Sequence, residues 1–148
     1  MTTPTADRTI ERLNGYLRNE LRAAHTYAQA LHKLGDDREL AATLEACLRS
    51  HRARAERLRE QIEELGGVPC ERAGAWAGTE RLFETDRAVD PRSALDALEW
   101  VEVYNSADYE VGAHAEPSWL RRFVESTLVP EQRRSYGSLW RLRTRLSH

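Results

Sequence analysis

Apolar residues recur at every third or fourth position along most of this chain, which is the spacing of one face of an α-helix. Leu and Ala dominate these positions and runs of β-branched residues are missing, so the sequence favours helices over strands. The first apolar stripe ends at Gly35, and Asp36 with Glu39 forms a capping-box-like start for the second helix. Gly66 and Gly67 close the second stripe. The pattern therefore predicts helices over residues 6–34 and 37–65.

Proline residues mark the starts of two further helices. Asp90 followed by Pro91 is a cap with proline at the first helical position, and an apolar stripe runs from there to residue 113. Pro117 opens a last helix that reaches residue 146, and Pro130 inside it should kink or briefly interrupt it. The sequence predicts an all-α protein with helices over 6–34, 37–65, 91–113 and 117–146.

The connections between these helices constrain the topology. Short turns join the first helix to the second and the third to the fourth, so each pair should be antiparallel. Residues 66–90 are too many for a structureless loop, and we expect them to run back along the bundle, with a helical turn around Trp76, Leu82 and Phe83 holding them down. The second and third helices should then run parallel. An antiparallel four-helix bundle with one long crossover is the ferritin-like topology.

Composition excludes several classes of function. The 148 residues fit one domain, spanning 1–148, and 22 Lys+Arg against 24 Asp+Glu exclude a nucleic-acid or membrane partner recognised by bulk positive charge. Cys47 and Cys70 are too few for a disulfide framework, and the chain begins without the apolar stretch of a signal peptide. A cytoplasmic protein is expected. No phosphate loop, zinc-spacing motif or nucleophilic serine context is present, so we assign no catalytic residue.

Four ionisable residues interrupt the apolar stripes, one near the middle of each predicted helix. They are Glu20, His51, Glu102 and Glu131. The middles of bundled helices meet at the same height whichever way the helices run, so we expect these four side chains to converge in one layer of the core. Three buried carboxylates are costly without protons, cations or a metal. One solution is two irons, which such bundles hold with one Glu from each of two helices and Glu-x-x-His from each of the others.

Several segments resemble known ferritin-like proteins. Residues 13–31, LNGYLRNELRAAHTYAQAL, are similar to the first helix of bacterioferritin and its relatives, with Glu20 in the ligand position and Tyr27 in the aromatic one. The segment REQIEELGGVP resembles the end of their second helix. From AGAWAG through SALDALEWVEVYNSADYE onward, the chain resembles a small bacterial ferritin-like family of unknown function, distantly related to rubrerythrins. The resemblance implies the ferritin-like fold and a site derived from a di-iron centre.

The sequence departs from that pattern at both imidazole ligands. The expected Glu-x-x-His of the second helix is His51-x-x-Arg54, and Glu131 is followed three residues later by Arg134. A guanidinium is permanently charged and cannot bind a cation, so Arg54 and Arg134 would neutralise the carboxylates in place of a metal. We therefore favour a metal-free, salt-bridged core.

Two functional hypotheses follow from these departures. The first is a non-catalytic structural or interaction protein without a cofactor. The alternative is a redox or iron-handling protein that binds iron or another divalent metal at Glu20, His51, Glu102 and Glu131.

The apolar surface of the first helix is wider than one bundle seam requires. Tyr16, Ala23 and Ala30 flank its main stripe, and we expect a homodimer packed through the first and second helices. His25 and His32 lie beside the stripe and are interpreted as surface residues. Any of the four tryptophans that proves exposed would mark an interface.

Overall fold

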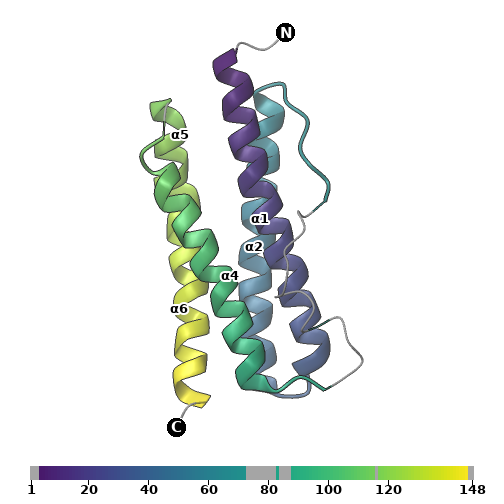
Figure 1. Ribbon diagram of the computed structural model, residues 1–148. Coiled ribbons are helices and arrows are strands. Elements are labelled where there is room, and N and C mark those ends of the chain that lie inside the picture. The colour runs from purple at the N-terminus through teal and green to yellow at the C-terminus, as the bar shows by residue number, and fades with distance from the viewer. Residues whose placement is uncertain (1–3, 73–82, 84–87, 116, 147–148) are drawn as a thin grey trace.

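The protein is described by a computed structural model that places residues 4–72, 83, 88–115 and 117–146 (Figure 1). These residues form α1 (Pro4–Leu34), α2 (Arg38–Glu64), α4 (Pro91–Gly112), α5 (Ser118–Phe123), the π-helix η1 (Val124–Leu128) and α6 (Val129–Leu146). The all-α prediction is confirmed, and the ends of the four predicted helices agree with the observed ones to within two residues. No helix in the described ranges is long and apolar enough to cross a membrane.

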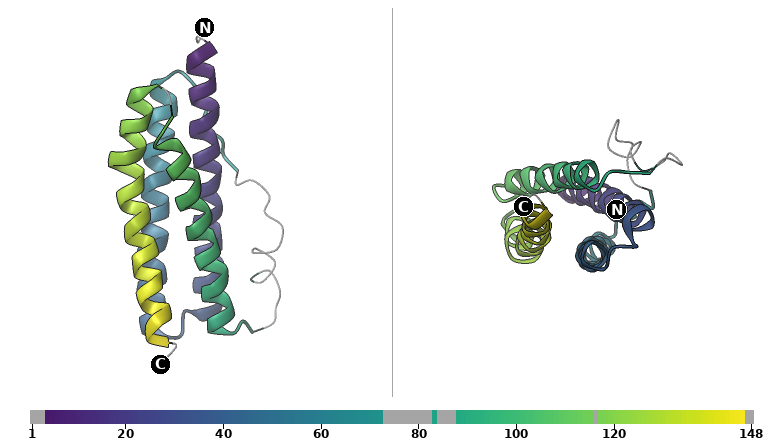
Figure 2. Two further views of the ribbon diagram at one scale, coloured as in Figure 1. Left: turned by 60° about the vertical axis from the view of Figure 1, so that its left-hand side comes forward. Right: turned by 90° about the horizontal axis from the view of Figure 1, so that it is seen from below.

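The helices pack as a four-helix bundle with one long crossover, as predicted. α1 and α2 are antiparallel, and α4 starts at the same end of the bundle as α2 (Figure 1). The main contacts join α1 to α2, α2 to α6, α6 to α4, and α4 to α1. α2 and α4 are therefore parallel and lie on a diagonal, as the view along the bundle shows (Figure 2).

Local side-chain chemistry explains where the helices begin and end. Asp37 caps α2, accepting from the amides of Glu39 at 3.0 Å and Leu40 at 3.1 Å, so the expected cap at Asp36 is one residue too early. An N-cap carboxylate reaches the second and third helical amides, and only Asp37 is at that distance from them. Asp90 caps α4 with proline following, as predicted. After α2, Gly66 has a φ of +81°, a conformation that glycine adopts without a steric cost.

The last helix contains the interruption that Pro130 predicts. Residues Val124–Leu128 form a π-helix directly before Val129 and Pro130. Pro130 has no amide hydrogen and its ring clashes with the preceding turn, and a wider turn relieves that clash without ending the helix. The segment therefore remains continuous from Ser118 to Leu146.

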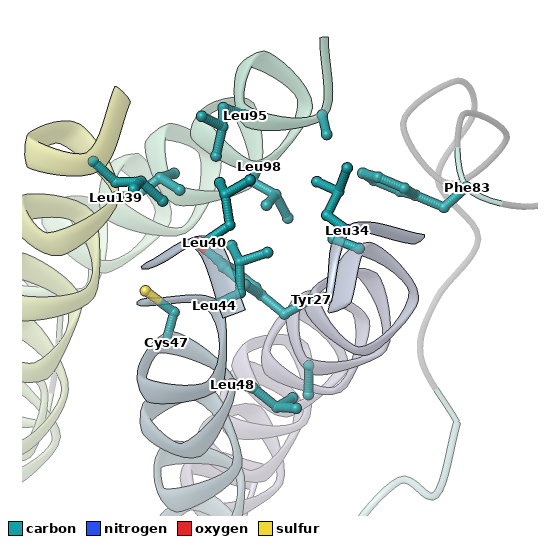
Figure 3. Packing of buried hydrophobic residues seen from close by; sticks show 14 residues of the cluster. Tyr27, Leu34, Leu40, Leu44, Cys47, Leu48, Phe83, Leu95, Leu98 and Leu139 are labelled. Carbon is teal, nitrogen blue, oxygen red and sulfur yellow. The ribbon is translucent and has the colours of Figure 1, made fainter. Parts of the chain in front are cut away.

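The start of the crossover is attached to α1. The side chain of Asn14 donates to the carbonyl of Val68 at 3.1 Å and accepts from the amide of Cys70 at 2.8 Å. Further along, Phe83 is buried against the end of the bundle that contains Leu34 (Figure 3). Trp76 and Leu82, expected beside Phe83, lie outside the described residues.

The apolar core is divided into two clusters. One contains Tyr27, Leu44, Leu98 and Leu139 and fills the end near the turn between α1 and α2 (Figure 3). The other is built around Leu17, Leu58, Leu120 and Leu128 near the opposite end. Between the two clusters lies a layer of buried polar side chains from α1, α2, α4 and α6, and this layer is the candidate site.

The face of α1 that we expected at a dimer interface is buried within the chain itself. Tyr16, Ala23 and Ala30 are all inside the bundle. Their heptad spacing continues the core seam formed with Glu20 and Tyr27, so it does not provide a second apolar surface. The argument for a dimer through α1 and α2 therefore loses its basis.

Candidate functional site

Seven polar side chains make up the buried layer between the two apolar clusters. All are at most 2% exposed, and they are Glu20 from α1, His51 and Arg54 from α2, Glu102 and Asn105 from α4, and Gln132 and Ser135 from α6. The sequence therefore placed Glu20, His51, Arg54 and Glu102 correctly.

His51 connects the two carboxylates across the layer. Its Nδ1 lies 2.6 Å from Oε2 of Glu20, and its Nε2 lies 2.9 Å from Oε1 of Glu102. An ionised carboxylate can only accept, so both ring nitrogens must donate and the ring is an imidazolium. Burial alone would lower the pKa of His51, but the charges of Glu102 and Glu20 outweigh it and raise the pKa.

Arg54 supplies the second positive charge. Its Nη1 forms an ion pair with Oε1 of Glu20 at 3.3 Å and also donates to Oε1 of Gln132. Its Nη2 donates to Oγ of Ser135 at 2.9 Å, and its Nε donates to the carbonyl of Ser50 at 3.3 Å. Two carboxylates, one guanidinium and one imidazolium make the layer formally neutral.

Neutral donors complete the coordination of each carboxylate. Glu20 accepts from the hydroxyl of Tyr109 and, at 3.4 Å, from the side-chain amide of Asn105. Glu102 has three such donors, namely the Tyr27 hydroxyl at 2.7 Å, the Gln132 amide at 2.7 Å and the Ser135 hydroxyl at 3.1 Å. Hydrogen bonds of this kind stabilise the ionised form of a buried carboxyl group.

The shifted pKa values agree with this charge arrangement. Burial would raise the pKa of both carboxyl groups, but Arg54 and His51 hold the pKa of Glu20 below its ordinary value, and His51 with Arg54 does the same for Glu102. Burial and the adjacent carboxylate raise the pKa of Tyr27 and of Tyr109 well above the ordinary phenol value. Both phenols therefore remain hydrogen-bond donors to the carboxylates.

Glu131 and Arg134 do not belong to the layer, contrary to prediction. Arg134 is 71% exposed and pairs with Glu131 at 2.5 Å on the surface, where Glu131 also accepts from Ser50 at 3.1 Å. The buried positions of the last helix are instead Gln132 and Ser135. Glu131 lies on the side of α6 that faces α2, one residue before the position that points into the core.

The sequence contained a signal for Gln132 that the search for charged residues missed. Gln132 lies four residues after Leu128, three before Ser135 and seven before Leu139, and all of these side chains are buried. Heptad spacing therefore makes Gln132 a candidate core position beside Glu131. The di-iron pattern consists of carboxylates and imidazoles, so it did not point to a neutral amide.

The remaining candidates occupy ordinary positions. His25 and His32 are exposed, as expected. Cys47 is buried and donates to the carbonyl of Ser135 at 3.5 Å, and burial raises the pKa of its thiol to about 12. Cys70 is half-buried beside Asn14. Neither thiol has the lowered pKa of a nucleophile.

The layer does not fit a di-iron centre as its side chains stand. The geometric positions are present, since α2 contributes His51-x-x-Arg54 and α6 contributes Gln132-x-x-Ser135 where the di-iron pattern has Glu-x-x-His. Both nitrogens of His51 are already engaged by carboxylates, and the Arg54 guanidinium lies 3.0 Å from its Nδ1. Within the described residues, no group of three or more His, Cys, Asp and Glu side chains is arranged to hold a metal ion.

Comparison with known proteins supports the architecture. No family model matches the sequence, and no curated protein matches it. Among solved structures, the fold is similar to one described as "ferritin like, diiron-carboxylate proteins from Bacillus anthracis str. Ames", with a TM-score of 0.75 and 21% identity over 96% of this chain and 99% of that one. Together with the crossover and the mid-bundle polar layer, this likeness shows that the protein has the ferritin-like four-helix-bundle fold.

Proposed function

We propose that this protein is a ferritin-like bundle whose di-iron site has been replaced by a metal-free ion network, and that it acts as a non-catalytic structural or interaction protein. The observation that carries the proposal is the position of Arg54. Its guanidinium is buried between Glu20, His51 and Gln132, in the layer where a ferritin-like bundle holds its metals. A permanent cation at that point neutralises carboxylate charge and repels a metal ion.

The residues at the ligand positions of α2 and α6 support the same conclusion. The di-iron pattern has a carboxylate and an imidazole on each of two helices. At the matching positions this chain has His51 and Arg54 on α2, and Gln132 and Ser135 on α6. The replacements also hydrogen-bond with one another and with Glu102. Both carboxylates, His51 and Arg54 therefore have partners without a metal, which supports a structural role for the layer.

Metal analysis of the purified chain tests this proposal. The protein would be incubated with Fe(II) without oxygen, and separately with Zn(II), then passed over a desalting column and analysed by plasma mass spectrometry. We expect far less than one metal per chain and a melting temperature that EDTA does not change. One or two tightly held metals per chain, with a melting temperature that EDTA lowers, would overturn the proposal.

A variant that restores the ligands tests which α6 positions are equivalent to the metal site. His51→Glu, Arg54→His, Gln132→Glu and Ser135→His together recreate both Glu-x-x-His pairs at the buried positions, and we expect this variant to bind Co(II) and to melt higher with it than without. The matched control is Arg134→His, which creates Glu-x-x-His on the surface and should add no metal binding. Gain of binding in the control would contradict the assignment of Gln132 and Ser135.

The alternative function is that of a metal-binding redox or iron-handling protein. It is favoured by the printed description of the similar structure, which names a diiron-carboxylate protein, and by the presence of Glu20, Glu102 and His51 in one layer. In that case Arg54 would have to leave the layer and His51 would have to lose a proton before a metal could bind. The metal analysis described above distinguishes the two functions.

A further inference from the structure

A shallow groove lies on the surface between α4 and α6, which are adjacent in the bundle (Figure 2). Ser106 of α4 lines one side of it, and Tyr136, Gly137 and Trp140 of α6 line the other. We call this hollow the α4–α6 groove. Its volume is about 390 Å³, within the range of roughly 300–1,000 Å³ that small-molecule sites occupy. The groove can therefore accommodate a molecule with one or two rings.

The α6 side of the groove is aromatic. Trp140 is 55% exposed although it is one of the largest apolar side chains in the protein. Tyr136 lies four residues before it, on the same face of the helix, and lines the same groove. Rings presented in this way favour a planar partner, which can pack against their faces or edges.

Gly137 keeps the floor of the groove open. Glycine is among the least favourable residues inside a helix, and Gly137 is in the middle of α6. Among the described residues, a Cβ at this position would meet only Nη1 of Arg141, at 3.3 Å. Packing within the described chain therefore does not require glycine here, and the missing side chain leaves space beside Trp140.

The arginines of α6 divide into a paired and an unpaired set. The two that line the groove, Arg133 and Arg141, form no ion pair with any residue that the structure describes. The other three are paired with carboxylates within the chain, namely Arg134 with Glu131, Arg143 with Asp96 and Glu99, and Arg145 with Glu39. The positive charge that α6 leaves without a carboxylate partner is therefore located at the groove.

The two unpaired guanidinium groups lie at opposite ends of the groove. Arg141 extends over Gly137, and its Nη2 donates to Oγ of Ser138 at 3.4 Å. Arg133 is eight residues earlier, which is about 12 Å along the helix. A ligand that lies on the aromatic wall is therefore between two cations.

Acidic side chains are present only beyond one end of the groove. Among the described residues, no Asp or Glu lines the groove itself. Glu110 and Glu125 line a neighbouring hollow, which shares Ser106, Gln132 and Arg133 with the groove. The lining of the groove therefore favours an anionic ligand, and the neighbouring hollow does not.

We propose that the α4–α6 groove binds a small aromatic carboxylate. Its ring packs against Trp140 over the open floor at Gly137, and its carboxylate accepts hydrogen bonds from the guanidinium of Arg141. A guanidinium presents two parallel N–H donors, which match the two oxygens of a carboxylate. Arg133 attracts the anion from the other end. This binding site goes beyond the structural role proposed for the buried layer and does not require that layer to be free of metal.

The first test compares three probes of similar shape and different charge. Cinnamate, cinnamyl alcohol and cinnamylammonium would each be titrated into the full chain labelled with fluorinated tryptophan, with fluorine NMR as the measurement and Trp140→Phe to assign the Trp140 signal. We expect cinnamate to shift that signal with a Kd on the order of 1 mM, as its small size allows. The alcohol and the ammonium compound should bind at least about tenfold more weakly, because neither can pair with a guanidinium.

Trp100 is the internal control for non-specific aromatic binding. It is 51% exposed and stacks with Tyr104, so its aromatic surface is as accessible as that of Trp140. It lies on α4 and does not line the groove. A shift of the Trp140 signal that does not saturate by about 10 mM cinnamate, equal binding of the three probes, or an equal shift of the Trp100 signal would overturn the proposal.

The second test removes one charge at a time. Arg141→Gln should weaken cinnamate binding by at least about fivefold, since it removes the charged partner of the carboxylate. Arg134→Gln is the matched control, because it removes an exposed arginine of the same helix that does not line the groove, and it should leave the Kd unchanged. Equal effects of the two substitutions would overturn the assignment of Arg141.

The third test fills the floor of the groove. Gly137→Leu should abolish cinnamate binding because its side chain would occupy the space beside Trp140. Gly15→Leu is the control, since a Cβ at Gly15 on α1 would meet only Nη2 of Arg18, at 3.9 Å. Unchanged binding by a folded Gly137→Leu variant would overturn the proposal. Circular dichroism shows whether the variant folds, and the comparison of Arg141→Gln with Arg134→Gln decides the proposal if it does not.

Discussion

Arg54 and Arg134 show how the position of a charge decides its energetic weight. Both follow a candidate ligand by three residues, and both pair with a glutamate. Arg54 is 1% exposed, so its removal leaves a carboxylate in a region that water does not reach. Arg134 is in water, where its partner can be solvated instead.

The first prediction compares these two arginines. Arg54→Met should lower the free energy of unfolding by about 3–5 kcal/mol, because Glu20 would remain buried with less compensating charge. Arg134→Met should change it by at most about 1 kcal/mol. Urea unfolding of both variants measures the difference, and similar losses in both would contradict the burial of Arg54.

The second prediction concerns Gly112 at the end of α4. A Cβ at this position would collide with the hydroxyl of Tyr16 and lie 3.0 Å from its Cζ, and the Tyr16 ring is held edge-on against Tyr109 at 5.2 Å. Gly112→Ala should therefore destabilise the protein by about 1–3 kcal/mol, as other overpacking substitutions do.

Gly137→Ala is the control for that prediction. A Cβ there would meet only the end of the Arg141 side chain, at 3.3 Å, and that side chain can move. Alanine has the higher helix propensity, so thermal unfolding of Gly137→Ala should show unchanged or slightly increased stability. A stable Gly112→Ala variant would mean that Tyr16 can shift without cost.

At the scale of the element, the register of a helix decides which side chains enter the site. The π-helix before Pro130 ends at Leu128, and from there the core positions follow as Gln132, Ser135 and Leu139. Glu131 is therefore left beside the core even though it is three residues from Leu128. A single position along one helix separates a side chain in the layer from one at the partly exposed surface.

The third prediction concerns the crossover, which is attached to α1 through Asn14. Asn14→Ala removes the bond to the Val68 carbonyl and the bond from the Cys70 amide. We expect a loss of about 1–2 kcal/mol in unfolding free energy and faster tryptic cleavage within residues 66–90, because each net hydrogen bond contributes about 1 kcal/mol. Asn19→Ala, which removes a contact between α1 and Asp108, is the control and should leave cleavage of the crossover unchanged.

At the scale of the whole molecule, the ion network links stability to pH. The folded pKa of His51 lies above its ordinary 6.5. Its contribution to the free energy of unfolding is therefore complete below pH 6.5 and is lost as the pH rises through the folded pKa. The folded pKa values of Glu20 and Glu102 lie below their ordinary 4.5. Their contributions to the free energy of unfolding are therefore complete above pH 4.5 and are lost as the pH falls through the folded pKa values. Both contributions are complete together between 4.5 and 6.5.

The fourth prediction is therefore a stability maximum in that window. Urea unfolding of the wild-type chain on either side of it should give lower free energies of unfolding, and the alkaline decrease should disappear in His51→Gln. The charges around His51 come from Glu20, Arg54 and Glu102, so the variant isolates the imidazolium. A wild-type profile that stays flat well above 6.5 would indicate a neutral His51.

The sequence by itself determined the helices, their connections and much of the polar layer. Apolar spacing and caps are local properties, so they predicted the four helices and the parallel pair joined by residues 66–90. A polar residue within an apolar stripe turns with that stripe toward the core. On that basis Glu20, His51 and Glu102 were placed in the layer correctly, whereas Glu131 was not.

Only the tertiary structure decided which neighbouring residue enters the core and which apolar face remains exposed. Glu131 and Gln132 differ by a rotation of about 100° around the same helix, and contact with α2 determines which of them is buried. Tyr16, Ala23 and Ala30 looked like an interface in sequence, but α1 uses them inside the bundle, and the exposed aromatic residues are on α4 and α6. Burial is a property of the packed helices together, so the periodicity of one helix cannot specify it.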